Sequence, residues 1–135
     1  MVDMCDVETM ALSMPDAHKE LRDGDRPAFV VDRKLFCFHR AQRKDAVDPS
    51  TGVRLDDVLV FRVADEEMKA MWLAEKPHVY FTTEHFNGHP WILLRISSLA
   101  EIDGDELSEL VTDAWLARAP KRLTKNWLEQ HELGG

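Results

Sequence analysis

Apolar residues at helical spacing predict a first helix near the start of the chain. This helix over residues 6–14 would be capped by Asp6 and would end before Pro15. Its apolar residues recur at the i, i+3, i+4 and i+7 positions of one helix face: Val7, Met10, Ala11 and Met14. We therefore expect one face of this helix to be buried.

Two further helices are predicted to start at aspartates. Asp65 would cap a helix that Pro77 closes, and Asp103, with Glu106 three residues later, would start another that ends before Pro120. The apolar stripe expected for the first of them is Met68, Met71 and Trp72. The stripe expected for the second is Leu107, Leu110, Val111, Ala114 and Trp115.

Short apolar runs predict the strands of a sheet. They are residues 28–31, 35–39, 58–63, 79–82 and 91–96. Residues 16–27 and 40–57 are polar and rich in turn-forming residues, so both are expected to be loops. The run of four apolar residues that begins at Val58 is typical of a central strand. The order α-β-β-β-α-β-β-α predicts an α+β fold, with helices packed on an antiparallel sheet.

The size and composition are those of one globular domain. The chain has 135 residues, of which 44% are hydrophobic and 31% charged. We expect a single domain over 1–135, with its core over 6–119 and a polar tail over 120–135. The longest apolar runs have four residues, whereas a transmembrane helix needs about 20. Residues 1–8 lack the features of a secretory signal and the two cysteines fit a reducing compartment, so we expect a cytoplasmic protein without membrane contact.

Several motifs follow one another along the chain. They are Met14-Pro15, Phe29-x-Val31-x-x-Lys34-x-Phe36, Tyr80-Phe81-x-x-x-His85-Phe86-Asn87-Gly88, Trp91-Ile92-Leu93-Leu94-Arg95, and Glu106-Leu107-x-x-Leu110 followed by Ala119-Pro120-Lys121-Arg122-Leu123. In combination they resemble the MmcQ/YjbR family over nearly the whole length. The resemblance implies a CyaY-like (frataxin-like) sandwich. Members of this family are often labelled DNA-binding, and no catalytic residues are carried over from them.

The sequence departs from the family pattern at two places. Residues 41–53 look like an extended hairpin or an insertion, and the turn at 32–34 lacks glycine. Both departures concern loops, so they leave the expected fold unchanged.

Basic residues are segregated although the formal net charge is −8. Residues 33–44 contain five basic and no acidic side chains, and residues 118–125 contain four basic and none acidic. Such stretches could create a positive potential on one side of the protein that attracts phosphate groups. Basic residues are also common in solvated loops and at the C-terminal ends of helices, where they have no binding role. The candidate DNA-contacting residues are Arg33, Lys34, Arg40, Arg43, Lys44, Lys121, Arg122 and Lys125.

Residues 84–91 form the densest polar segment. His85 and His89 have the spacing of a helical zinc pair, but Asn87-Gly88 and Pro90 favour a turn instead of a helix. A metal site across this turn would use Glu84, His85 and His89. The simpler interpretation is a turn at Asn87-Gly88 with local hydrogen bonding by His85. The functional alternative is contact with a protein or a small ligand through His85, Asn87, Trp91 and Arg95.

Arg95 lies inside an apolar strand, so it is expected to pair with an acidic residue or to face an anionic ligand. Cys37 is expected to be a buried apolar residue, and Cys5 an exposed one. The sequence contains no nucleophile-elbow, phosphate-loop or CxxC motif. We therefore assign no catalytic residue, no cofactor and no metal.

The sequence thus indicates a non-enzymatic, cytoplasmic binding protein that contacts DNA through its basic stretches. The alternative function is a protein- or small-ligand-binding module built on residues 85–91. A third hypothesis is an undetected enzyme or weak metal binding at the acidic residues Asp3, Asp6 and Glu8. The oligomeric state does not follow from the sequence.

Overall fold

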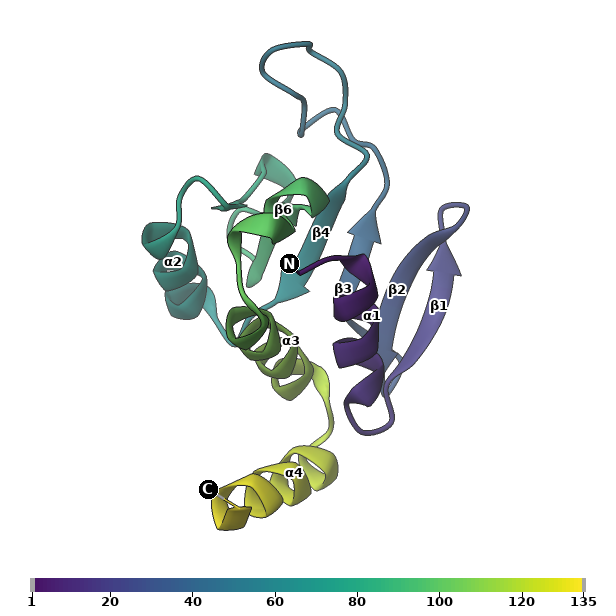
Figure 1. Cartoon of the computed structure of the whole chain (residues 1–135), viewed down its shortest axis with the longest axis vertical. Coiled ribbons are helices and arrows are strands. Elements are labelled where there is room, and N and C mark those ends of the chain that lie inside the picture. The colour runs from purple at the N-terminus through teal and green to yellow at the C-terminus, as the bar shows by residue number, and fades with distance from the viewer. Residues whose placement is uncertain (1, 135) are drawn as a thin grey trace.

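A computed structural model describes residues 2–134 of the chain, which form one six-stranded sheet with its helices (Figure 1). The strands are β1 (His18–Arg22), β2 (Arg26–Val31), β3 (Lys34–Arg40), β4 (Val58–Arg62), β5 (Tyr80–Phe81) and β6 (Trp91–Arg95). The helices are α1 (Met4–Ser13), α2 (Glu66–Glu75), α3 (Gly104–Arg118) and α4 (Lys121–Gly134), with the 3₁₀ helices η1 (Glu84–Phe86) and η2 (Ile96–Glu101). Across the sheet the order is β1-β2-β3-β4-β6-β5, and every neighbouring pair is antiparallel. The predicted α+β fold with an antiparallel sheet is confirmed.

Two elements correct the order predicted from the sequence. β1 lies where a loop was expected, and α4 occupies the polar tail. β1 is an edge strand with mostly exposed side chains, so it has no apolar run to reveal it. α4 buries little apolar surface, because Leu123 and Trp127 are the residues through which it packs on the core.

The helix starts are set by aspartate side chains. Asp65 accepts a 2.9 Å hydrogen bond from the backbone N–H of Met68, and Asp103 caps α3 in the same way, so both predicted caps are confirmed. The first predicted helix is present as α1, but its predicted cap was wrong, since Asp3 caps it and Asp6 completes a capping box. Two of the three carboxylates considered for metal binding therefore stabilise the end of a helix.

The apolar stripe of α2 also differs from the prediction. Met71 is 51% exposed, whereas Lys69, only 4% exposed, points inward beside Trp72. The stripe of α3 is confirmed, since all five of its predicted residues are buried. Cys37 is buried and Cys5 exposed, as expected.

The β2–β3 turn needs no glycine because Asp32 and Arg33 both adopt a left-handed backbone conformation, with φ of 49° and 66°. Positive φ at both central residues is the mark of a type I′ turn, which matches the twist of a hairpin. The β2–β3 hairpin therefore forms its turn without glycine at these two positions.

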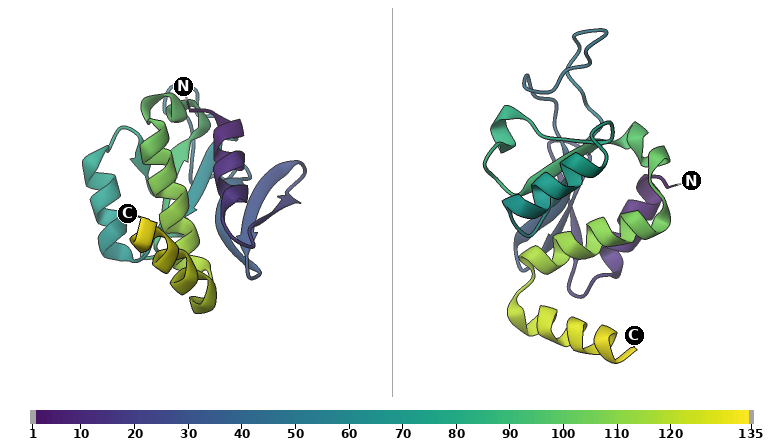
Figure 2. Two further views of the ribbon diagram at one scale, coloured as in Figure 1. Left: turned by 60° about the horizontal axis from the view of Figure 1, so that its bottom comes forward. Right: turned by 90° about the vertical axis from the view of Figure 1, so that its left-hand side faces the viewer.

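The main core lies between the sheet and the helices α1 and α3, which share one face (Figures 1 and 2). β4 runs through the middle of the sheet with four buried residues, which confirms that it is central. Leu59 and Phe61 of β4 point into this core, together with Phe29 of β2 and Trp115 of α3.

The opposite face of the sheet, turned away from α1 and α3, is called the distal face here. Strand alternation places Val58 and Val60 of β4 on it, and the β4–β6 register pairs Val60 with Leu93. The apolar cluster of this face consists of Val58, Val60, Phe86 and Leu93, with Phe38, Leu55, Phe81 and Trp91 packed against them.

α4 lies beyond the end of α3 and projects from the body (Figures 1 and 2). The ring of Trp127 packs on Trp115, with 6.2 Å between ring centroids. None of the helices in residues 2–134 combines the length and apolar character of a membrane span.

Candidate functional site

Two arginine side chains flank one tryptophan on the distal face. The guanidinium carbons of Arg62 and Arg118 lie 5.5 Å and 5.7 Å from the centroid of the Trp91 ring. The ring of Phe38 stands edge-on to Trp91, with 5.8 Å between centroids and 75° between planes. All four side chains are partly exposed. We call Arg62, Arg118, Trp91 and Phe38 the arginine–aromatic cluster.

Three elements assemble this cluster. The antiparallel register of β4 and β6 pairs Arg62 directly with Trp91. Arg118 comes from the end of α3, where its Nε donates a 3.0 Å hydrogen bond to the carbonyl oxygen of Leu35. Arg62 Nε donates to the carbonyl oxygen of Val63 at 3.1 Å. These bonds orient both guanidinium groups without neutralising them.

The cluster carries unbalanced positive charge. Among the side chains described for residues 2–131, no carboxylate forms an ion pair with Arg62 or Arg118. Burial and, to a lesser degree, the nearby charge of Arg62 lower the pKa of Arg118. Each cation–π contact contributes about 0.5–2 kcal/mol, but the two like charges still repel. A bound anion would relieve that repulsion.

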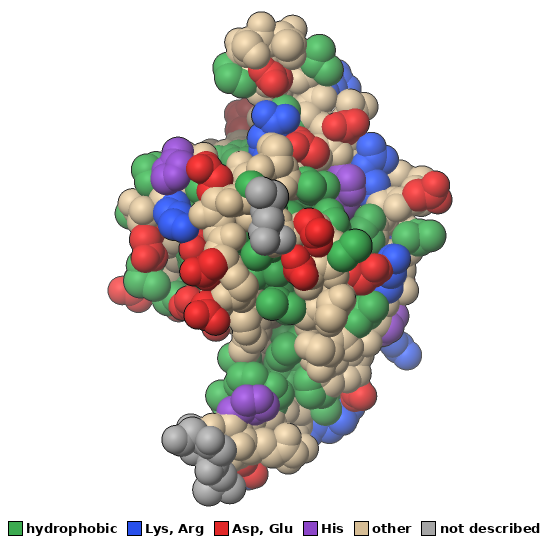
Figure 3. Space-filling view, in the orientation of Figure 1, with side chains coloured by type: hydrophobic (Ala, Val, Ile, Leu, Met, Phe, Trp, Pro, Cys, Tyr) green, Lys and Arg blue, Asp and Glu red, His purple; other side chains and the backbone are tan. Residues whose placement is uncertain are grey.

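Acidic side chains gather over the helices instead. Figure 3 looks onto α1, α2 and α3 and has carboxylates spread over that side. The first turns of α2 and α3 contain four acidic residues: Glu66, Glu67, Asp105 and Glu106. With a formal net charge of −8, an anion is attracted only where cations stand without carboxylate partners, as Arg62 and Arg118 do among the described side chains.

A pocket of about 540 Å³ opens where β3 ends. It is lined by Asp23, Phe38, Arg40, Ala41, Arg43, Lys44, Asp45, Glu84, His85 and Phe86. We call it the β3 pocket. Since Phe38 belongs both to this pocket and to the arginine–aromatic cluster, the two features adjoin on the distal face.

Arg40 organises the inner wall of the β3 pocket. Its side chain is 7% exposed and pairs with Asp45 through two contacts, Nη1–Oδ1 at 2.8 Å and Nη2–Oδ2 at 3.0 Å. The guanidinium also lies over the ring of Phe86, 5.1 Å from its centroid. Hydrogen bonding from Arg40 lowers the pKa of Asp45 to about 2, so the carboxylate stays ionised at neutral pH.

A family model named YjbR matches residues 12–117. The chain belongs to the YjbR family. Its relatives include uncharacterised proteins of Mycobacterium tuberculosis and Mycobacterium bovis, each 42% identical over 102 residues, which cover 73% of this chain and 77% of the relative. The resemblance inferred from the sequence motifs is thus confirmed for the family.

A solved structure supports the fold of this YjbR-family chain. The crystal structure of Deinococcus radiodurans protein DR2400, described as a DUF419 domain, matches with a TM-score of 0.61. The match covers 99% of this chain and 89% of that one, at 18% sequence identity. This likeness establishes the fold alone.

The predicted DNA-contacting residues lie in different parts of the fold. Arg33 and Lys34 are exposed at the β2–β3 turn, whereas Arg43 and Lys44 are exposed at the other end of β3. Seven residues of extended strand separate the two pairs by about 20 Å. Arg40, between them, is buried in its ion pair. The remaining three candidates are exposed on α4: Lys121, Arg122 and Lys125.

The predicted ligand loop contributes to both distal-face features. His85 is exposed and lines the β3 pocket, and Trp91 is the centre of the arginine–aromatic cluster. Asn87 ends η1, and Gly88 follows it with a φ of 81°, in keeping with the predicted turn. Across the described side chains no three His, Cys, Asp or Glu residues converge as a metal site, and that includes Glu84, His85 and His89.

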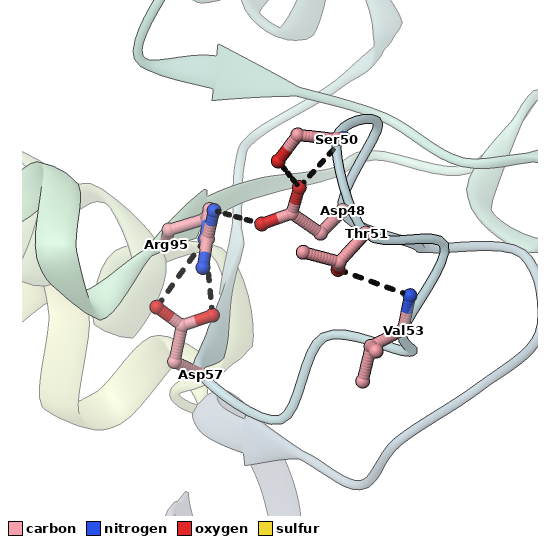
Figure 4. Close-up of polar contacts among 6 residues, drawn as sticks. All are labelled: Asp48, Ser50, Thr51, Val53, Asp57 and Arg95. Carbon is pink, nitrogen blue, oxygen red and sulfur yellow. Dashed lines mark hydrogen bonds and ion pairs between the residues drawn. The ribbon is translucent and has the colours of Figure 1, made fainter.

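Arg95 is engaged in a structural ion pair (Figure 4). Its Nε donates to both carboxylate oxygens of Asp57, at 3.1 and 3.3 Å, and its Nη1 lies 3.8 Å from Asp48. Asp48 in turn accepts hydrogen bonds from the backbone and hydroxyl of Ser50. Of the two alternatives expected for Arg95, the structure has the pairing with acidic residues, and this pairing fastens the 41–57 segment to β6.

Sequence reasoning missed Arg62 and Lys69. Arg62 is a single basic residue at the end of an apolar strand, and its pairing with Trp91 depends on a register that the sequence does not display. Lys69 donates to the carbonyl oxygens of Phe86 and His89, at 2.6 and 2.8 Å. Its position three residues before Trp72 was the available signal that it shares the buried face of α2.

Proposed function

We propose that this YjbR-family chain is a non-enzymatic, cytoplasmic protein that binds single-stranded DNA on the distal face of its sheet. The observation that carries the proposal is the arrangement of Arg62 and Arg118 around Trp91. Neither cation has a carboxylate partner among the described side chains, and partly exposed aromatic rings lie beside both.

The chemistry of a single strand suits this surface. Phosphate groups interact with cations, and unstacked bases pack on aromatic side chains, each base contributing about 1–3 kcal/mol. The bases of a duplex are stacked inside it, so a duplex would contact only the cations, through its phosphates, and not the aromatic rings. The two halves of the first basic stretch lie at opposite ends of β3, so this stretch does not form one continuous binding surface. Its separation further favours a site on the distal face.

Fluorescence anisotropy of a labelled single-stranded oligonucleotide across a salt series tests the proposal. Arg62→Gln removes one cation of the cluster but keeps a polar side chain of similar length. Arg54→Gln, an exposed position in the 41–57 segment, is the matched control. Circular dichroism establishes that both variants are folded.

We expect binding that weakens log-linearly with added salt. Arg62→Gln should weaken it about tenfold and reduce the salt slope by about one, because one phosphate contact is lost. Arg54→Gln should change the affinity by less than about twofold, as expected for a residue that makes no contact. Absence of binding at low salt, or equal losses in the two variants, would overturn the proposal.

A further inference from the structure

We infer that the β3 pocket receives one unstacked nucleotide whose base carries an exocyclic amino group. The inference rests on the proposed function and names what the pocket would recognise in a strand. It draws on the size of the pocket, its aromatic walls and the arrangement of its charges.

The size and walls of the pocket suit a planar ligand. Its volume of about 540 Å³ lies within the range of about 300–1,000 Å³ that small-molecule sites occupy. Phe38 and Phe86 supply aromatic surface, and His85 stands edge-on to Phe86 with 4.8 Å between ring centroids. A base has the flat apolar faces that such walls contact.

The charges at the rim call for a ligand with two kinds of polar group. The Arg40–Asp45 pair neutralises itself, which leaves two cations, Arg43 and Lys44, and two carboxylates, Asp23 and Glu84, in the lining. All four of these side chains are exposed. A simple anion would pair with the cations but would be repelled by the carboxylates. An apolar ligand would interact favourably with neither group. A nucleotide brings a phosphate for the cations and N–H donors for the carboxylates.

The carboxylates also favour some bases over others. Asp23 and Glu84 accept hydrogen bonds, so they suit the exocyclic amino groups of adenine, cytosine and guanine. Thymine has no such group and offers carbonyl acceptors instead. The pocket should therefore discriminate against thymine.

The inner wall is held in place by contacts within the protein. The guanidinium of Arg40 lies over the ring of Phe86, and Lys69 holds the backbone carbonyl oxygen of the same residue. A wall fixed in this way does not have to be ordered on binding, which favours affinity.

Isothermal titration calorimetry with free dAMP, dTMP and inorganic phosphate tests the inference. The variants are Arg43→Gln with Lys44→Gln, which removes the cations, and Glu84→Gln, which removes one carboxylate. Lys121→Gln on α4 is the control, because this exposed cation lies outside the pocket.

We expect saturable binding of dAMP at least fivefold tighter than that of dTMP or phosphate, which corresponds to about 1 kcal/mol. The double variant should weaken dAMP binding about tenfold. Glu84→Gln should reduce the ratio of the affinities for dAMP and dTMP. Lys121→Gln should change neither the affinity for dAMP nor this ratio. No saturable binding of dAMP up to about 5 mM, or equal binding of dTMP or phosphate, would overturn the inference.

The two proposals fail separately. If the oligonucleotide binds and responds to Arg62→Gln while dAMP does not bind, the inference is overturned and the proposed function stands. If dAMP binds with the expected preference while the oligonucleotide does not bind, the pocket is supported as a nucleotide site and the proposed function is overturned.

Discussion

Lys69 Nζ, in α2, donates a 2.6 Å hydrogen bond to the carbonyl oxygen of Phe86, in the wall of the β3 pocket. The same ammonium group donates to the carbonyl oxygen of His89 at 2.8 Å. Lys69 is 4% exposed, and burial lowers its pKa. One charged group from α2 thus fixes the segment that joins β5 to β6 and shapes the distal face.

Lys69→Met should destabilise the fold by about 2–3 kcal/mol, because it removes two hydrogen bonds from a charged donor, although each carbonyl oxygen keeps one backbone N–H donor. Urea denaturation measures the loss, and Lys34→Met, at an exposed position of β3, is the control. The control should change the free energy of unfolding by less than about 0.5 kcal/mol. Equal stability of Lys69→Met and wild type would mean that the two hydrogen bonds do not hold the loop.

The ion pair between Arg40 and Asp45 should make stability depend on pH in the acid range. The folded chain lowers the pKa of Asp45 from 3.8 to about 2, since Arg40 hydrogen-bonds the ionised carboxylate. The stabilisation is fully present above about pH 4 and is lost as the pH falls through the folded-state pKa of about 2.

Asp45→Asn tests that dependence. It should destabilise the fold by about 2–4 kcal/mol at pH 7, because it removes the partner of a buried arginine. The difference in unfolding free energy between variant and wild type should shrink as the pH falls from about 4 to 2. Urea titrations at several pH values measure it, and a difference that stays constant over this range would contradict the assignment.

Arg95→Met should loosen the 41–57 segment without unfolding the protein. The pair with Asp57 is partly exposed, so its loss should cost less than about 1 kcal/mol of global stability. Amide hydrogen exchange should nevertheless rise about tenfold within the segment, for instance at Gly52, whose N–H donates to Asp48. Arg54→Met, an exposed residue of the same segment, should leave the exchange unchanged. Equal exchange rates in the two variants would mean that Arg95 does not fasten this segment.

Trp127→Ala should detach α4 from the body. Trp127 is partly buried against Trp115, so its removal should cost about 2 kcal/mol and expose α4 to proteases. Leu128→Ala is the matched control, because Leu128 is 42% exposed on the same helix. Limited proteolysis followed by mass spectrometry locates the cuts. If both variants resist digestion as the wild type does, Trp127 is not the anchor.

Elements with strong local patterns were predictable from the sequence. Five apolar residues at helical spacing and the cap at Asp103 identified α3, and a run of four apolar residues identified β4. Each pattern reflects contact of one continuous element with the core, so the residues carry the information themselves. β1 lacked such a pattern, since most of its side chains face solvent, and among the described side chains of α4 only Leu123 and Trp127, four residues apart, pack on the core.

The candidate site was predictable only in fragments. The basic stretch and the 84–91 loop were separate hypotheses in the sequence, yet Arg43 and His85 line one pocket. Arg62 and Trp91 become neighbours through the β4–β6 register, which depends on how the whole sheet is assembled. Conversely, Arg33 and Lys34 are close to Arg43 and Lys44 in sequence, but extended β3 holds them apart.

The sequence by itself determined the family, the α+β class, the main helices and the segregation of basic residues, because these depend on local pattern and composition. Only the tertiary structure decided which cations meet which aromatic rings. Arg40 forms an ion pair with Asp45, and Arg95 forms one with Asp57. Arg62 and Arg118 instead lie beside Trp91 without a carboxylate partner among the described side chains. The physical reason is that charge pairing depends on distances of a few ångströms, and sheet register and helix ends fix those distances.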